Sequence, residues 1–255
     1  MRILTQLPQD DLLAVPATAR AAETAGFNGL TTSENKNDPF LALAVAAVST
    51  QHASLQTSIA IAFSRSPMAV ANASWDLQTA SRGRFVLGLG SQVRAHNENR
   101  FSVPWTAPAP RMREYVLALR AIWRNWEKGE KLDFRGTHYK FTLMTPNFTP
   151  TSTHQPPIPV TIAAVGPVMV RVAGEVCDGV RLMLSTPEPG FDHPGSVVYF
   201  AVDDIRLTHE ALKSRGVTFR AEPHKIATLA DREVWLAEFE DTEGNTLALM
   251  SEPRI

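Results

Sequence analysis

Segments typical of β-strands alternate with segments typical of α-helices through the first two-thirds of the chain, at intervals of roughly 25–30 residues. Two helical segments begin with an N-cap residue followed by proline, Asp38-Pro39 and Ser66-Pro67. Because successive parallel strands require a crossover connection, this alternation predicts a parallel sheet with helices between its strands. The expected strands are residues 2–6, 29–33, 56–62, 84–89, 159–163 and 179–184, and the expected helices are residues 16–25, 39–50, 67–81, 111–127 and 167–175.

The alternation is interrupted between the fourth and fifth expected strands. Residues 91–110 contain three prolines and no periodic pattern, which predicts a long loop. Residues 132–141 are expected to form a small hairpin around Arg135-Gly136. Five prolines between residues 146 and 159 indicate a stiff connector that leads into the fifth strand.

After Leu184 the pattern changes. A strand is expected at residues 196–202 and a helix at 205–214, and three further strand-like runs follow at 217–220, 234–239 and 246–250. A (β/α)8 barrel needs eight strands to close, and the first part supplies six. The predicted fold class is therefore α/β: an incomplete (β/α)8 TIM barrel of about six β-α units over residues 1–184, followed by a β-α-β-β-β half domain over residues 185–255.

The charge distribution supports two units and limits the classes of partner. Residues 1–179 hold 17 Lys and Arg against 13 Asp and Glu, whereas residues 180–255 hold 8 against 13. The net charge of −1 predicts no attraction to nucleic acid, and the longest apolar run, Leu41–Val48, is too short to cross a bilayer. The N-terminus has no apolar signal core, and the one cysteine, Cys177, precludes an internal disulfide. We expect a cytoplasmic protein that acts on a small-molecule substrate, with no nucleic acid and no membrane as partner.

Polar residues and glycines follow several of the expected strands. Active sites of β/α barrels lie at the carboxyl ends of the strands, so these residues are candidates for contact with a cofactor or substrate. Backbone N–H groups at a strand-to-helix turn, together with the helix dipole, favour an anion, although an ordinary turn has the same appearance in a sequence. The candidates for cofactor binding are Ser64, Gly90, Ser91, Gln92, Val165, Gly166 and Pro167.

Two side chains are candidates for catalysis. Glu34 follows the second strand and is the candidate carboxylate, whereas nearby Asp38 is expected to cap a helix. His96 lies beyond the fourth strand, where a solvated loop histidine is the alternative interpretation. The sequence contains no G-x-S-x-G motif, no phosphate-binding P-loop motif and no complete dinucleotide fingerprint.

Residues 1–179 resemble the luciferase-like monooxygenase superfamily, and within it the branch that depends on the deazaflavin coenzyme F-420. The resemblance implies an oxidoreductase that binds coenzyme F-420, or FMN as the alternative, and transfers hydride to or from a small organic substrate. It implies that the turn at 164–167 holds the cofactor phosphate and that Ser64 lies near the ring. One departure is Asn37, where many relatives carry histidine. The segments that carry the resemblance are residues 26–47, 57–96, 104–126, 132–146 and 159–180.

Residues 179–252 resemble the C-terminal part of a glyoxalase/bleomycin-resistance (vicinal oxygen chelate) domain, a family that chelates divalent ions with His and Glu. At the two corresponding ligand positions this chain has Val197 and Ala248, so no metal site is expected. His193, His209 and His224 lack ligand spacing and are expected at the surface. The segments that carry this resemblance are residues 179–205, 211–219, 222–224 and 234–252.

Three hypotheses remain open at this point. The first is the cofactor-dependent oxidoreductase, with a homodimer or the last strands covering the open edge of the barrel. The second is a non-catalytic fusion protein whose glyoxalase-like module serves dimerisation or ligand binding. The third is a metal-dependent glyoxalase-type enzyme assembled by dimerisation, against which Val197 and Ala248 argue.

Overall fold

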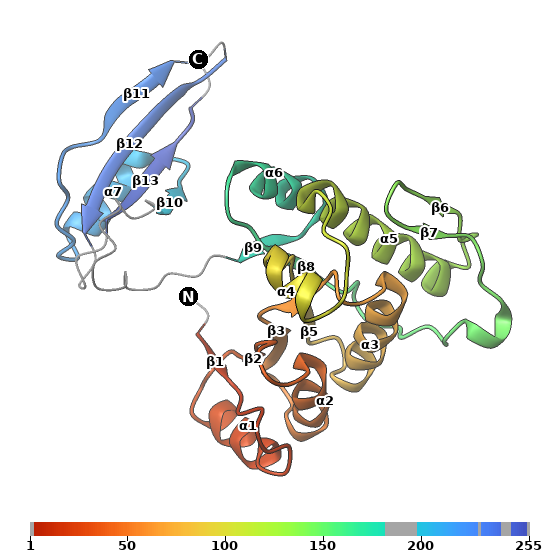
Figure 1. The fold of residues 1–255 in the computed structure, drawn as a ribbon. Coiled ribbons are helices and arrows are strands. Elements are labelled where there is room, and N and C mark those ends of the chain that lie inside the picture. Colours follow the sequence, from red (N-terminus) through yellow and green to blue (C-terminus); the bar gives the residue numbers. More distant parts are fainter. Residues whose placement is uncertain (1–2, 182–197, 229–230, 241–245, 254–255) are drawn as a thin grey trace. The chain divides into compact units, whose positions relative to one another are not determined.

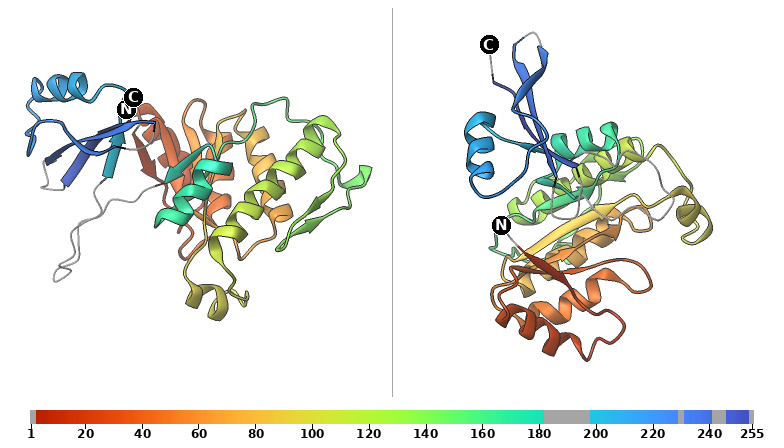
Figure 2. Two further views of the ribbon diagram at one scale, coloured as in Figure 1. Left: turned by 90° about the horizontal axis from the view of Figure 1, so that it is seen from above. Right: turned by 90° about the vertical axis from the view of Figure 1, so that its left-hand side faces the viewer.

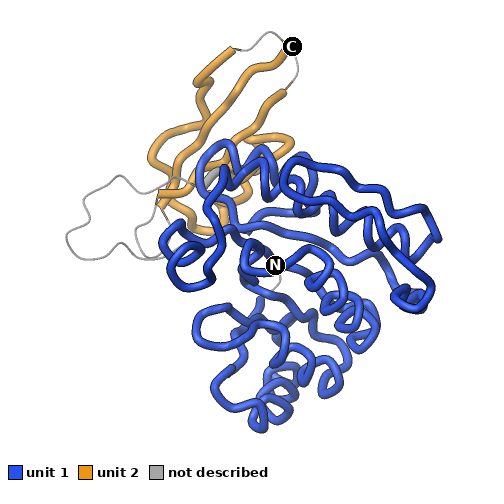
Figure 3. Tube along the Cα trace, turned by 45° about the vertical axis from the view of Figure 1, so that its right-hand side comes forward, with its two compact units in different colours: residues 1–183 blue, residues 184–255 orange. Residues whose placement is uncertain are grey.

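A computed structural model describes residues 3–181, 198–228, 231–240 and 246–253. The chain divides into two compact units, Met1–Met183 and Leu184–Ile255 (Figure 3). Along the described part of the chain, no helix combines the length and hydropathy that crossing a membrane requires.

The first unit is built on a curled parallel sheet (Figure 1). Each neighbouring pair of strands is parallel, and the order in the sheet follows the order in the sequence, as in the wall of a TIM barrel. Its six-strand path confirms the predicted incomplete barrel. Among the described residues of this unit, the first and last strands of the path each pair with a single neighbour. The path runs β1 (Leu4–Gln6), β2 (Gly29–Thr32), β3 (Ser54–Thr57), β5 (Phe85–Gly90), β8 (Val160–Ala163) and β9 (Gly179–Arg181), and β4 (Ala60–Ile61) pairs with β5.

Helices cover one face of this sheet (Figure 2). Apolar side chains of the strands point to that face and are fully buried in the main hydrophobic core: Leu30, Leu55, Leu87 and Ile162. This burial explains why the strands contain so many apolar residues. The helices are α1 (Val15–Thr24), α2 (Pro39–Ser49), α3 (Pro67–Ala80), α5 (Pro108–Lys128) and α6 (Pro167–Val176).

The opposite, concave face of the sheet carries small and polar residues. Gln56 and Thr31 are register partners there, and so are Gly88 and Thr161. Closed TIM barrels fill their interior with layers of branched aliphatic side chains. The concave face of this half-barrel therefore differs from an ordinary barrel core.

The predicted helix starts are confirmed. The carboxylate of Asp38 accepts a hydrogen bond from the N–H of Phe40 at 2.8 Å, and the hydroxyl of Ser66 accepts one from Met68 at 3.2 Å. Proline occupies the first turn of both helices, where its missing N–H has no helical partner to lose.

Two local predictions for the first unit are wrong. Residues 91–110 are not one loop, because α4 (Arg94–Asn99) forms within them and α5 already begins at Pro108. Residues 56–62 are not one strand, because β3 ends at Thr57 and β4 begins at Ala60, with a cis peptide between Ser58 and Ile59. The expected hairpin is present as β6 (Phe134–Arg135) and β7 (Lys140–Phe141), followed by the short 3-10 helix η1 (Pro146–Phe148).

The second unit has the predicted element order β-α-β-β-β. Its four strands form a sheet in the order β10-β13-β12-β11, in which β10 is parallel to β13 and the other pairs are antiparallel. Ile205, Ala237 and Leu249 form its small buried core. The elements are β10 (Val198–Ala201), α7 (Ile205–Lys213), β11 (His224–Thr228), β12 (Glu233–Glu240) and β13 (Thr246–Ser251).

Two expectations for the second unit are corrected. Residues 217–220 form no strand; only Phe219 makes a single bridge, to Phe239, and the outer strand is β11, which begins directly after Pro223. Proline lacks the N–H that a strand ladder requires, so the strand begins after it. His209 is buried rather than at the surface, because α7 turns it onto the ring of Phe219. His193 and Val197 lie outside the described residues.

Candidate functional site

The carboxyl ends of β2, β4, β5 and β8 lie along one edge of the parallel sheet. The register pairs Ile61 with Gly90 and Leu89 with Ile162, so the turns that follow these strands leave from the same edge. Gly90 is the last residue of β5, and Ser64 and Gly166 follow β4 and β8 within a few residues. The predicted cofactor-binding residues are therefore drawn from neighbouring positions on one rim.

Two glycines on β5 lie in close contact with the neighbouring segment, Gly88 with backbone and Gly90 with the side chain of Ile59. A Cβ at Gly88 would lie 2.0 Å from the carbonyl oxygen of Thr57, and a Cβ at Gly90 would lie 2.6 Å from the Cδ1 atom of Ile59. The Thr57 hydroxyl also donates to the Gly88 carbonyl at 2.7 Å. Packing of β3 and β4 against β5 is thus sufficient to explain why these positions are glycine.

The loop after β5 is fixed by a residue that the sequence analysis did not select. Asn97, buried on α4, donates from Nδ2 to the carbonyl oxygens of Ser91 at 2.9 Å and Val93 at 3.1 Å. Gln92 has a positive φ of 56°, and its side chain accepts the N–H of Val93 at 2.8 Å. His96 is exposed on the same short helix. An asparagine within a polar run after a strand is a weak signal, because only its burial reveals its role.

The turn at 165–167 opens α6 with an uncapped N-terminus. Gly166 is the N-cap, with φ at 84°, and none of the described side chains caps the helix. Nothing lies within 4 Å of the position that a Cβ would take there, and Val165 is 95% exposed. Pro167 has no N–H, and the first helical bond runs from Val170 to the Gly166 carbonyl. The backbone N–H groups of this turn are therefore available to an anion.

Glu34 is not a free carboxylate. Its oxygens accept hydrogen bonds from the backbone N–H of Ile61 at 2.7 Å and from Nη1 of Arg65 at 2.7 and 2.8 Å, and its side chain is only 5% exposed. Nη2 of Arg65 donates to Asp38 at 2.9 Å. Burial opposes the charge on Arg65, but the hydrogen bonds and charges of the two carboxylates outweigh it and raise the pKa of Arg65. The hydroxyl of Ser64 donates to the Ile61 carbonyl at 3.1 Å.

Arg65 was missed in the sequence because it lies between a strand and a helix cap, with no motif around it. The one available signal is its position just ahead of Ser66-Pro67, opposite the acidic turn after the second strand. Pairing across neighbouring strands brings it to Glu34 and Asp38.

A second arginine, Arg181, lies on the concave face and has only neutral partners. Its Nε donates to the Thr161 hydroxyl at 3.0 Å, Nη1 to the Ser58 hydroxyl at 3.3 Å, and Nη2 to the amide oxygen of Gln56. Within the residues that the structure describes, no carboxylate pairs with it, and burial lowers its pKa. Arg181 is the register partner of Ala163, the last residue of β8, so it lies beside the turn that leads into α6.

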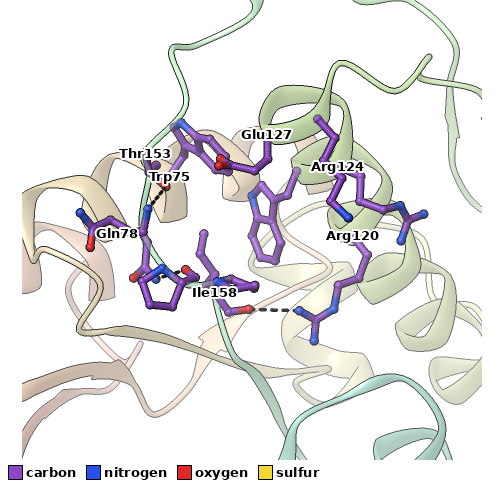
Figure 4. Close-up of a pocket in the computed structure, with 12 residues that line it drawn as sticks. Trp75, Gln78, Arg120, Arg124, Glu127, Thr153 and Ile158 are labelled. Atoms are coloured by element: carbon purple, nitrogen blue, oxygen red, sulfur yellow. Dashed lines mark hydrogen bonds between the residues drawn. The ribbon is translucent and has the colours of Figure 1, made fainter.

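An apolar pocket of about 180 Å³ lies at the opposite ends of the strands (Figure 4). Ile158, which precedes β8, lines it, and so does Gln78, whose side chain accepts the N–H of Phe85 at the start of β5. Trp75 donates to the carbonyl of Thr151 at 3.0 Å. Arg120 donates to the carbonyl of Ile158 at 3.1 Å (Figure 4). These contacts hold residues 151–158 against α3 and α5. The pocket lies at the amino ends of the strands, away from the predicted cofactor-binding residues at their carboxyl ends.

Comparison with known proteins adds family relationships to this geometry. The family model described as luciferase-like monooxygenase matches residues 3–192. An uncharacterized protein of Mycobacterium tuberculosis is 54% identical over 167 residues, which are 63% of this chain and 49% of that protein. A 5,10-methylenetetrahydromethanopterin reductase of Methanolobus tindarius is 29% identical over 71% of this chain and 53% of its own length. The chain thus spans about half the length of the curated relatives that it matches.

Solved structures show the same fold. The coenzyme F-420 dependent tetrahydromethanopterin reductase from Methanopyrus kandleri has a TM-score of 0.56 at 22% identity, over 70% of this chain and 55% of its own. A monooxygenase from Streptomyces bottropensis has a TM-score of 0.61 at 21% identity, over 71% of this chain and 59% of its own.

Proposed function

The chain belongs to the luciferase-like monooxygenase family, and from this premise we propose that its first unit serves a flavin- or deazaflavin-dependent oxidoreductase. The reaction proposed is hydride transfer to or from a small organic substrate. Similarity to reductases whose names include coenzyme F-420 supports this cofactor, and the monooxygenases among the structural neighbours keep FMN as the alternative. When bound, either ring accepts or donates the hydride. The protein therefore has to bind the cofactor, orient its ring toward the substrate and exclude water from the site.

The observation that carries the proposal is the coincidence of two features that favour anions at one end of the sheet. The N-terminus of α6 presents backbone N–H groups. The backbone of Arg181 pairs with the last residue of β8, and its guanidinium extends over the concave face, where its partners among the described residues are neutral. Both cofactors carry phosphate, and coenzyme F-420 has a polyanionic tail. The residues present therefore fit the anionic part of such a cofactor.

Separate roles follow for the predicted residues. Val165, Gly166 and Pro167 would hold the phosphate through the turn, while Ser91 and Gln92 shape the neighbouring loop. Exposed His96 would exchange a proton with substrate or solvent. We assign Glu34 a positioning role, because its carboxylate already accepts bonds from Ile61 and Arg65 and so holds the ends of β2 and β4 together.

The second unit supports an alternative function. Its β-α-β-β-β order fits the glyoxalase-like half domain, and in the described part of unit 1 the strands β1 and β9 each pair with a single neighbour. The alternative is a non-catalytic fusion protein in which this module serves dimerisation or ligand binding.

Titration of the intact protein with coenzyme F-420 and with FMN, followed by cofactor fluorescence, separates these functions. We expect stoichiometric binding of one of the two. Gly166→Ala should weaken it several-fold, because alanine disfavours the φ of 84° that forms the turn. Gly174→Ala is the matched control: it lies in the same helix, has open space around it, and should leave binding unchanged. Binding of neither cofactor would reject the oxidoreductase and favour the alternative.

A further inference from the structure

Three potential metal ligands meet in the second unit, outside the region considered so far. His209 and Glu210 lie on α7, and Glu222 lies in the segment between α7 and β11. Nδ1 of His209 is 3.5 Å from Oε1 of Glu210 and 3.7 Å from Oε2 of Glu222. One donor atom from each residue lies within 4.8 Å of the other two.

The distances from Nδ1 of His209 to the two carboxylate oxygens are closer to those between ligand atoms of one metal ion than to hydrogen-bond distances. An N–H···O hydrogen bond brings the heavy atoms to about 2.7–3.2 Å, shorter than both distances. Two donors that each lie about 2.0–2.2 Å from a tetrahedral ion are separated by roughly 3.3–3.6 Å. The observed 3.5 and 3.7 Å are therefore close to the spacing that an ion would impose.

The imidazole of His209 supplies independent support. Its side chain is 1% exposed, and Nε2 has no hydrogen-bond partner among the described residues. The ring of Phe219 packs against it, with 4.2 Å between the centroids. Nδ1 is the nitrogen that faces the two carboxylates. In the neutral imidazole that binds a metal through Nδ1, Nε2 carries the proton, and the packing on Phe219 fixes the ring in that orientation.

The surroundings leave the two carboxylates accessible. Both glutamates are largely exposed, and Lys213 binds the other oxygen of Glu222, Oε1, at 2.8 Å. A cavity of about 490 Å³ is lined by His209, Lys213 and residues 217–222. Two carboxylates, a neutral imidazole and the cation of Lys213 sum to a charge of −1, which favours a divalent cation.

We propose that His209, Glu210 and Glu222 bind one divalent transition-metal ion of the zinc class. The mixed nitrogen and oxygen ligand set favours zinc, cobalt or nickel over magnesium and calcium, which prefer oxygen alone. Three protein ligands leave a fourth position for water. These three residues are not at the ligand positions of the glyoxalase-like family, which Val197 and Ala248 occupy in this sequence.

The test uses the intact protein after dialysis against a chelator. Zn2+ is titrated by calorimetry and Co2+ by its visible absorption. We expect one ion per chain and a Co2+ spectrum of low coordination number. Glu210→Gln and Glu222→Gln should each weaken the affinity by more than about tenfold, because even outer-shell partners typically contribute that much. His209→Ala should abolish binding.

The control is Glu240→Gln, which removes an exposed carboxylate of the same unit that pairs with Arg220 at 2.7 Å. It should bind Zn2+ as the unmodified protein does. Because His209 is buried, its variant can lose its fold, so the two exposed glutamate variants decide the outcome, with circular dichroism as the check on folding. Substoichiometric binding, or stoichiometric binding that neither glutamate variant weakens, would overturn the site.

Discussion

Arg65 donates from Nη1 to the Glu34 carboxylate at 2.7 Å, and this pair joins the segment after β4 to the segment after β2. The contact spans 31 residues of sequence and lies at the rim where the cofactor is proposed to bind. The same guanidinium reaches Asp38, the N-cap of α2. One side chain therefore joins two connections of the barrel wall, the one from β2 to α2 and the one from β4 to α3.

Loss of Arg65 should destabilise the first unit. Arg65→Met leaves the buried Glu34 carboxylate without its cation, which should lower the free energy of unfolding by about 3 kcal/mol. Chemical denaturation measures this loss. Arg65→Lys, which keeps the charge, should recover part of it. A methionine variant as stable as the unmodified protein would show that the pair contributes nothing net.

Arg181→Met should leave stability nearly unchanged, in contrast to Arg65→Met, and should instead weaken ligand binding. This guanidinium has neutral partners among the described residues, and burial lowers its pKa. Because no carboxylate is left unpaired, the unfolding free energy should change by less than about 1 kcal/mol. The affinity for the proposed cofactor or an anionic substrate should fall. Denaturation and fluorescence titration on one preparation check both outcomes, and a loss of stability equal to that of Arg65→Met would contradict the assignment.

Glu114 should make stability depend on pH in the acid range. Burial raises its pKa, but the backbone N–H groups of His138, Thr137 and Tyr139 outweigh that effect and lower the pKa below the ordinary 4.5. A carboxyl whose pKa is depressed on folding stabilises the protein above its unfolded value and loses that contribution as pH falls through the folded value. Glu114→Gln should therefore flatten the fall in stability below pH 4.5, measured by thermal unfolding between pH 3 and pH 7. A profile that is unchanged in the variant would reject this.

Cys177 should react slowly while the protein is folded. Burial raises its pKa from 9.0 to about 11, with Arg120 opposing and Asp178 adding to the shift. At pH 8 the thiolate fraction should be about one-hundredth of that of an unperturbed thiol, and the rate of alkylation by iodoacetamide should fall in proportion. Denaturant should restore the ordinary rate. Rapid alkylation of the native protein would contradict the burial.

The sequence by itself determined the order of the elements and the number of strands in the barrel wall. Asp38-Pro39 and Ser66-Pro67 act within their own helices, since a cap binds an N–H two residues away, and such short-range signals are visible in a sequence. Alternation at a fixed interval likewise indicates parallel strands and crossovers. The placement of the predicted cofactor-binding residues at the carboxyl ends of the strands follows from that order alone.

Only the tertiary structure decided which side chains are engaged and which remain available. The carboxylate of Glu34 is paired with Arg65, which lies 31 positions away in the sequence. Arg181 bonds to Gln56 across 125 positions. His209 was predicted at the surface, yet α7 buries it against Phe219 and beside Glu222. These outcomes depend on long-range packing, in which burial and pairing arise from segments that the local pattern does not connect.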